Sequence, residues 1–206
     1  MPKAPQPDPP AREGKVNRKE QMVIAAEALL RARGLGGVTT RAIAQAVPCS
    51  EGAIYVHFKD RLDLLLAVLQ RCLPDMLIPL HALDAKVGAG TPRRNLILAL
   101  AGLARFHDRV TPMLCSLLTE PELLQRFRAS LAGEGKGPHR GIASLARYIE
   151  SEQKLGRIPT ELDAETAAST LMAGSFFHIF TSHLLGAPTR FDARRLVEFA
   201  IPSGDR

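Results

Sequence analysis

The sequence predicts an all-α protein, and three observations point to this class. Apolar residues recur at helical spacing in segment after segment, and no stretch alternates apolar and polar residues as a half-buried strand does. The hydrophobic residues make up 46% of the chain but include only 8 Phe, 2 Tyr and no Trp, so Ala and Leu must build the core. Such a core favours helices.

The N-terminal third predicts a tail followed by three helices. Residues 1–14 contain five prolines and few apolar side chains, which predicts a disordered tail. A helix is expected from about residue 17 to residue 33, with Gly34 as a left-handed cap. A short helix follows, capped by Thr39 or Thr40 and ended by Pro48, and Ser50 caps a third that runs to about residue 55.

Prolines and glycines divide the rest of the chain. A longer helix begins at Lys59 or Asp60, and Pro74 and Pro79 are expected to break or kink it. The pairs Thr91-Pro92 and Thr111-Pro112 each predict a helix start, because proline is favoured at the first helical position. Further helices are expected over about 120–131, 141–154, 163–185 and 192–200, with a glycine-rich loop at 133–138.

Composition narrows the classes of function. The net charge of +6 is compatible with a polyanionic partner, although a solvated basic surface produces the same number. Three separated cysteines, Cys49, Cys72 and Cys115, predict neither a disulfide framework nor a zinc site. The start has no secretory pattern and the longest apolar run is too short to cross a bilayer, so we expect a soluble cytoplasmic protein with no membrane partner.

The most informative segment runs from Thr39 to Leu65. Two short helices with a tight connection, braced by a preceding helix, predict a helix-turn-helix. Such a unit lays its second helix in the major groove of DNA.

This segment resembles the tetracycline-repressor (TetR) family. The resemblance covers residues 17–66, and its most specific part is the block S-x-G-x-x-Y-x-H-F, formed by Ser50, Gly52, Tyr55, His57 and Phe58. Three positions depart from the family pattern: Pro48 and Cys49 stand where the family has glycine and valine, and Arg61 stands where it has lysine. The resemblance implies a DNA-binding domain over 15–66 and a helical effector-binding and dimerisation domain over 67–206.

Candidate DNA contacts follow from the helix-turn-helix. Thr39, Thr40, Tyr55, His57, Lys59 and Arg61 are candidates for phosphate contacts, and Arg41, Ser50, Glu51, Gly52 and Ala53 for contacts near the bases. Each has an alternative: Gly52 can serve helix packing, Tyr55 can be a half-buried core residue, His57 a helix cap, and Glu51 a solvated first-turn carboxylate. Basic residues between Arg12 and Lys19 form either a minor-groove arm or a solvated tail.

For the second domain, the family resemblance provides the main expectations. The resemblance implies a homodimer on a palindromic operator and a small-molecule effector of unknown identity. Candidate pocket residues, each of which can equally be plain core, are Phe106, His107, Met113, Leu117, Phe127, Tyr148, Met172 and Phe176. The helix over 163–185 is apolar nearly all round, which indicates one side in the core and another against a partner, or a wholly intramolecular central helix.

Two other classes of function compete with a DNA-binding regulator. The sequence has no G-x-S-x-G, no phosphate-cradling glycine motif, no H-E-x-x-H and no convincing acid/base pair, so we expect no enzyme, no catalytic residue, no cofactor and no metal. A helical small-molecule-binding or adaptor protein without DNA binding is the other rival.

Overall fold

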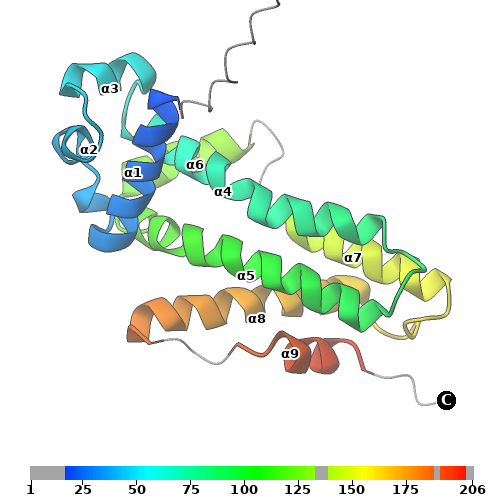
Figure 1. Cartoon of the computed structure of the whole chain (residues 1–206). Helices are drawn as coiled ribbons and strands as arrows, with labels where there is room; N and C mark the ends of the chain where they lie inside the picture. Colours follow the sequence, from blue (N-terminus) through cyan, green and yellow to red (C-terminus); the bar gives the residue numbers. More distant parts are fainter. Residues whose placement is uncertain (1–16, 133–138, 188–190, 203–206) are drawn as a thin grey trace, which may run out of the picture.

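The computed structural model describes residues 17–132, 139–187 and 191–202, and these residues form helices and no strand. Three helices gather at one end of the molecule (Figure 1): α1 (Arg18–Arg33), α2 (Thr40–Ala46) and α3 (Glu51–His57), with a 3-10 turn η1 (Leu35–Gly37) after α1. We call this group the head. The body contains α4 (Arg61–Asp84), α5 (Pro92–Leu117), α6 (Pro121–Ala132), α7 (His139–Lys154), α8 (Ala164–Leu185) and α9 (Ala193–Ala200). The all-α class is confirmed, whereas the expected tail 1–14 and the expected loop at 133–138 lie outside the described residues.

Side-chain caps place the helix starts close to where the sequence predicts them. Thr39 accepts a hydrogen bond from the amide of Ala42 at 3.1 Å, and Ser50 accepts one from the amide of Ala53 at 3.3 Å. Asp60 caps α4 in the same way, with 3.0 Å to the amide of Asp63. These oxygens satisfy amides that have no partner within the first turn of a helix.

The prolines do not divide the helices as expected: neither Pro74 nor Pro79 breaks α4, and the prediction of a helix start at Pro112 was wrong. α4 runs unbroken through Pro74 and Pro79, and α5 runs through Pro112, so the pair Thr111-Pro112 does not start a helix. Tertiary contacts compensate at Pro112, which has no amide for the carbonyl of Asp108. The imidazole Nε2 of His183, on α8, lies 3.1 Å from that carbonyl oxygen, and a carbonyl can only accept, so Nε2 carries the proton.

The long helix α4 packs along α5, and it also contacts α1, α6 and α7. The closest approach is at Gly102 of α5. A Cβ built on Gly102 would lie 2.1 Å from Cγ of Pro79 and 3.1 Å from the carbonyl oxygen of Asp75. Only glycine leaves room for α4 and α5 to approach each other this closely. The contact at Gly102 therefore fixes the position of α4, the helix that leads from the head into the body.

α8 packs on α5, α7 and α9, and one of its faces carries small residues that are buried. Ala167, Ala168, Leu171 and Ser175 are buried within the chain, and Leu196 of α9 fills the space beside Gly174. The close helix approach that these small side chains permit is therefore made inside one chain.

Two apolar clusters form the core. One holds α1 to α3 together with Val68 and Cys72 of α4, the C-terminal part of α5, and Phe127 of α6. The other lies among α4, α5, α7, α8 and α9. The core of the head therefore extends past residue 66 into helices of the body. Because α1 packs directly against α4 and α5, a movement of either helix would displace α1.

Within the described residues, α4 is the one helix long and apolar enough, by length and composition, to cross a membrane. Its middle carries Arg71 and Asp75, which make ion pairs with neighbouring helices. These contacts, and its position against α1, α5 and α7, are those of a core helix.

Candidate nucleic-acid interface

The connection between α2 and α3 is short and has an extended start. It comprises Val47 to Ser50, and Val47 has extended angles because it precedes Pro48. The side chain of Val47 is buried, and Cys49 packs against the core of the head. The unusual Pro-Cys pair is thus accommodated in a tight turn that joins two seven-residue helices.

α3 has one anchored face and one free face. Ile54 and Phe58 are each 3% exposed and pack in the core of the head, whereas Tyr55 is 63% exposed and Val56 is 81% exposed. Figure 1 shows α3 at the outer edge of the head. The alternative of a half-buried core tyrosine is excluded by the exposure of Tyr55, and the assignment of Phe58 to the core is confirmed.

Thr40 and Glu51 join the two helices at their N-terminal ends. The Thr40 hydroxyl donates to Oε2 of Glu51 at 2.8 Å, while Thr39 is the residue that caps α2. Glu51 is therefore neither a free carboxylate nor simply a solvated one. The bond links the start of α2 to the start of α3.

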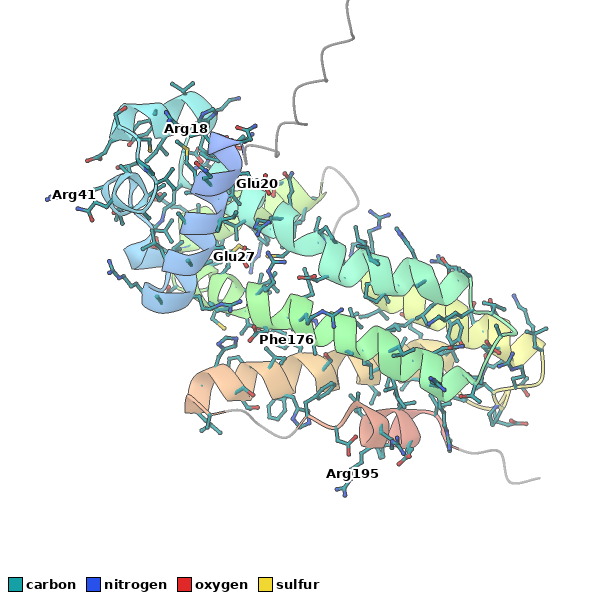
Figure 2. All side chains as sticks on the ribbon, in the orientation of Figure 1. Arg18, Glu20, Glu27, Arg41, Phe176 and Arg195 are labelled. Carbon is teal, nitrogen blue, oxygen red and sulfur yellow. The ribbon has the colours of Figure 1, made fainter. Side chains whose placement is uncertain are left out.

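The remaining candidates are placed around the free face of α3. Arg41, Gly52 and Lys59 are exposed, and Ala53 and His57 are half-buried. Figure 2 shows Arg41 pointing outward from α2. A Cβ on Gly52 would meet only Oγ of Ser50, at 3.9 Å, so no neighbouring helix requires a glycine there.

Arg61 is turned into the protein. Its guanidinium donates to the carbonyl oxygen of Leu35 and lies 3.6 Å from the carboxylate of Glu120, so it joins the η1 turn to the start of α6. Arg126 of α6 adds a second link, 2.5 Å from Asp60 at the N-terminus of α4. The bond from Arg126 and the amide of Asp63 hold the pKa of Asp60 below its ordinary value.

Val56 was not among the candidates, although it is the most exposed large apolar side chain of the head. The family pattern leaves this position open, so the resemblance did not mark it. Its spacing from Gly52 was the available signal, because residues four apart lie on one side of a helix.

The basic residues around the start of α1 are described only in part. The ammonium group of Lys19 lies 5.5 Å from the centre of the Phe58 ring. Arg12 lies outside the described residues.

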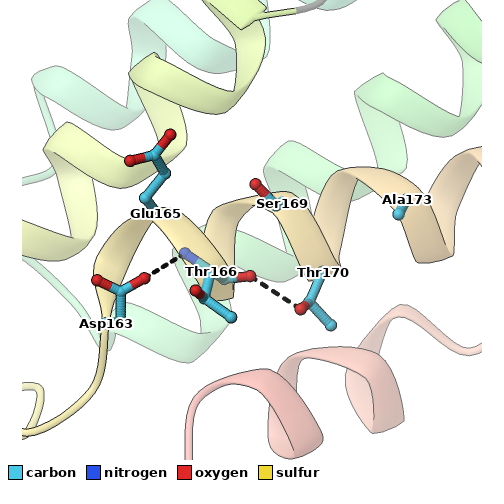
Figure 3. A pocket seen from close by; sticks show the side chains of 6 residues that line it. All are labelled: Asp163, Glu165, Thr166, Ser169, Thr170 and Ala173. Carbon is cyan, nitrogen blue, oxygen red and sulfur yellow. Dashed lines mark hydrogen bonds between the residues drawn. The ribbon is translucent and has the colours of Figure 1, made fainter.

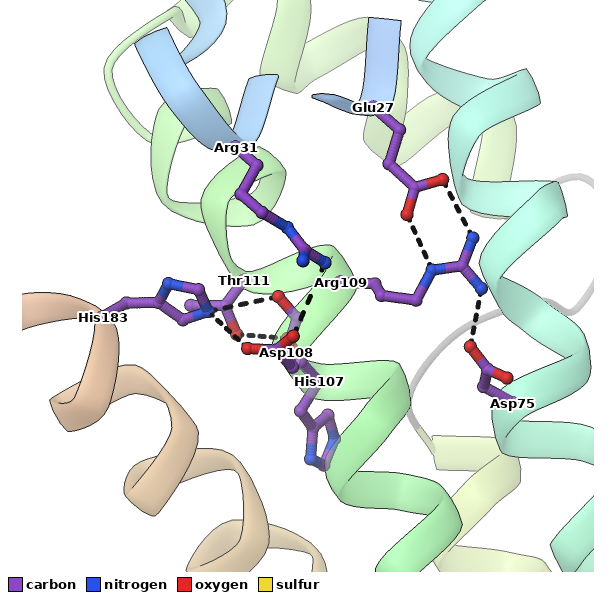
Figure 4. Close-up of polar contacts among 8 residues, drawn as sticks. All are labelled: Glu27, Arg31, Asp75, His107, Asp108, Arg109, Thr111 and His183. Carbon is purple, nitrogen blue, oxygen red and sulfur yellow. Dashed lines mark hydrogen bonds and ion pairs between the residues drawn. The ribbon is translucent and has the colours of Figure 1, made fainter. Parts of the chain in front are cut away.

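Charged side chains join the head to the body between α1, α4 and α5 (Figure 4). Arg109 of α5 donates to both carboxylate oxygens of Glu27 of α1, at 2.7 and 2.9 Å, and to Asp75 of α4 at 2.6 Å. Burial opposes ionisation of Glu27, but the hydrogen bonds and charge of Arg109, with the charges of Arg71 and Arg31, outweigh it and lower the pKa of Glu27.

A second chain of contacts reaches from α8 to α1. His183 lies 3.2 Å from a carboxylate oxygen of Asp108, and the other oxygen of Asp108 lies 3.5 Å from Arg31 near the end of α1. Figure 4 shows both His183 and Arg31 directed toward Asp108. Helices α1, α5 and α8 are thereby joined without any intervening loop.

The eight candidate pocket residues do not gather in one place. Met113, Leu117 and Phe127 are buried in the core that holds the head, and Tyr148 and Met172 are buried in the core of the body. Tyr148 accepts a hydrogen bond from Asn95 at 2.9 Å. Of the remaining three, Phe106 packs against both cores, and the ring of His107 contacts the rings of Phe106 and Phe176.

His107 is the polar member of that aromatic group. Its Nδ1 lies 3.1 Å from the hydroxyl of Ser175, and burial lowers the pKa of His107 to about 4. The imidazole is therefore neutral near pH 7. A neutral ring between α5 and α8 is able to donate one hydrogen bond and accept another.

Two open hollows lie elsewhere on the body. One, of about 440 Å³, is lined by residues of α1, α4, α5 and α8 that include Arg31, Arg105 and Ile179. The other, of about 470 Å³, lies on the outer side of α8 from Asp163 to Ala173 (Figure 3). Neither is lined by any of the eight candidate pocket residues.

Comparison with known proteins agrees with this geometry. Residues 23–68 match the family model described as bacterial regulatory proteins, tetR family. The whole fold is similar to a TetR-like transcriptional regulator from Rhodococcus sp. RHA1, with a TM-score of 0.62 and 22% identity over 92% of this chain and 96% of that one. GusR of Salmonella enterica has a TM-score of 0.65 at 19% identity, covering 89% of this chain and 93% of its own.

A third structure, a transcriptional regulator of the TetR/AcrR family from Thermobifida fusca, has a TM-score of 0.60 and 19% identity over 92% of this chain and 99% of that one. The match by sequence covers the head and the start of α4, and the match by structure extends to the body. Residues 23–68 therefore resemble the tetR family of bacterial regulatory proteins in sequence, and the described residues share the fold of these three structures.

Proposed function

We propose that the protein is a cytoplasmic transcriptional regulator that binds double-stranded DNA through α2 and α3, with α3 in the major groove. One observation carries this proposal: the outer face of α3 is free, while Ile54 and Phe58 anchor its inner face in the core of the head. A short helix presented in this way has the dimensions that the major groove admits. The domain division at residues 15–66 and 67–206 and the absence of an enzymatic activity belong to the same proposal.

The side chains around α3 divide by chemistry. Tyr55, His57 and Lys59 have donors for phosphate oxygens and would position the head on the duplex. Arg41 points outward from α2, and its guanidinium has donors for a phosphate as well as for a base edge. Thr39, Thr40, Ser50, Glu51, Gly52 and Ala53 lie at the N-terminal ends of α2 and α3, where they would approach the bases or the adjacent backbone. Arg61 is assigned instead to the link between η1 and α6, because its guanidinium is already bound there.

We propose further that two chains form a homodimer through α8 and α9. The outer face of α8 has no ionisable side chain between Glu165 and His183; it carries Thr166, Ser169, Thr170, Ala173, Phe177, Phe180 and Leu184. Phe177 is 62% exposed there, and Phe199 of α9 is 79% exposed. An uncharged face with exposed aromatic rings is typical of a surface that a partner covers. A symmetric dimer would match a palindromic operator.

Release by a small-molecule effector would be a shift between two arrangements of the heads. The heads must stand about 34–36 Å apart to enter successive major grooves. An effector acts only through its different affinity for the two arrangements. The contacts of Arg109 and Asp108 with α1 are the route by which movement of α5 or α8 would reach the head. The three aromatic residues Phe106, His107 and Phe176 remain the best candidates to meet the effector.

The proposal is tested by selecting duplexes from a randomised library with the full-length protein and measuring affinity between about 50 and 200 mM salt. A DNA-binding regulator should select a palindromic sequence and lose affinity by orders of magnitude over this range. Arg41→Ala should weaken binding and flatten the salt dependence, whereas Arg94→Ala, an exposed arginine at the far end of α5, should leave both unchanged. If no sequence is enriched, the protein is a helical binding or adaptor protein without DNA recognition.

A further inference from the structure

The centre of the free face of α3 is apolar. Gly52 and Val56 lie four residues apart and therefore on the same side of the helix. Val56 is 81% exposed, and a Cβ on Gly52 would contact nothing closer than Oγ of Ser50 at 3.9 Å. The two methyl groups of Val56 therefore project from α3 next to the bare backbone at Gly52.

Polar side chains near this face are engaged or lie to its sides. Glu51 accepts from Thr40 at 2.8 Å, and Ser50 accepts from the amide of Ala53 at 3.3 Å. Tyr55 lies on one flank, and His57, on the other flank, is half-buried. The middle of α3 thus offers no side-chain donor or acceptor for the bidentate hydrogen bonds that read guanine or adenine.

In the major groove, the apolar feature that distinguishes one base from the others is the C5 methyl group of thymine. We infer that Val56 reads thymine by contact of its methyl groups with that C5 methyl, and that Gly52 lets α3 come close enough for the contact. This inference rests on the proposed function, since it requires α3 to enter the groove. The valine is suited to this role because its χ1 has one strongly preferred rotamer in a helix, which fixes the position of both methyl groups.

The occupant of this surface is therefore a duplex with thymine at one or two positions in each half-site. Exposed basic side chains of the head favour it over an apolar protein partner: Arg41 points outward from α2, and Lys59 follows α3 closely in the chain. A duplex supplies phosphate groups for such cations, whereas an apolar protein surface does not.

The test uses the duplex selected by the full-length wild-type protein. Each thymine is replaced in turn by uracil, which keeps the base pair and removes only the methyl group, and affinity is measured by fluorescence anisotropy. The wild type should lose about fourfold in affinity for each methyl group that Val56 contacts. Val56→Ala should bind the thymine duplex more weakly and should not distinguish uracil from thymine at those positions. Val87→Ala, a partly exposed valine distant from the head, should behave as wild type.

The outcomes separate the two claims. If no sequence is selected, the proposed function fails and this inference fails with it. If a sequence is selected but uracil substitution has no effect, or affects wild type and Val56→Ala equally, the inference alone is overturned. Val56→Thr keeps the shape and replaces one methyl group by hydroxyl, so it should retain part of the preference for thymine.

Discussion

Gly52→Ala should separate stability from DNA binding, because it adds a single methyl group at the centre of the proposed interface. The new Cβ would lie in open space, 3.9 Å from its nearest neighbour, so the fold does not resist it. Alanine is favoured over glycine in a helix by up to about 1 kcal/mol. In a chain of this length the melting temperature should rise by about 2–4 °C for each kcal/mol.

The effect on DNA binding should have the opposite sign. A methyl group forced into a closely packed interface costs about 1–3 kcal/mol, which corresponds to a loss of about fivefold to 150-fold in affinity. Differential scanning calorimetry gives the first quantity, and anisotropy with the selected duplex gives the second. Gly36→Ala is the matched control, since a Cβ there also meets nothing within 4 Å but the residue lies in η1, away from α3.

A Gly52→Ala protein that is more stable and binds its operator with unchanged affinity would refute the close approach of α3 to DNA at this residue. A protein that is less stable would refute the packing argument instead. The two measurements therefore test the interface and the fold independently.

Four further results are expected. Gly102→Ala should lower the free energy of unfolding in urea by about 1–3 kcal/mol, because its Cβ would lie 2.1 Å from a proline ring on α4. Arg109→Met should lower the free energy of unfolding at pH 7. In wild type, the lowered pKa of Glu27 contributes stability that is lost as the pH falls through the pKa of Glu27 in the folded protein. The free energy of unfolding of the variant should therefore decrease less on acidification than that of wild type. His107 has a pKa of about 4 in the folded protein, against an ordinary value of 6.5. The free energy of unfolding of wild type should therefore decrease as the pH is lowered from 6.5 to 4, by at most about 1.4 kcal/mol per pH unit. His107→Asn should lack this contribution. Phe177→Asp should give a folded monomer in sedimentation equilibrium, because the ring is 62% exposed in the single chain.

Local chemistry made the head predictable. Thr39, Ser50 and Asp60 cap their helices through hydrogen bonds to amides three residues away, and such contacts are set within a short stretch of sequence. The exposure of Tyr55 and the burial of Phe58 also follow from helical periodicity within a single turn.

The same local reasoning was wrong at Pro112, where a helix start was expected. A missing amide does end an isolated helix, but α5 continues past Pro112 because His183, some seventy residues later in the chain, approaches the orphaned carbonyl. Likewise the candidate pocket residues were chosen as apolar side chains on the expected helices. Their division between two cores depends on which helices meet, and periodicity does not contain that information.

The sequence by itself determined the helical class, the helices of the head with their caps, and the outward side of α3, because these depend on residues within about one helical turn of each other. Tertiary structure alone decided that Arg61 turns to Leu35 and Glu120, that Arg109 joins α1 to α4, and that the face of α8 with Ala167, Ala168 and Ser175 is buried within the chain. Those outcomes require knowing which distant segments lie side by side, and a long charged side chain reaches whichever acceptor the packing of the helices brings near it.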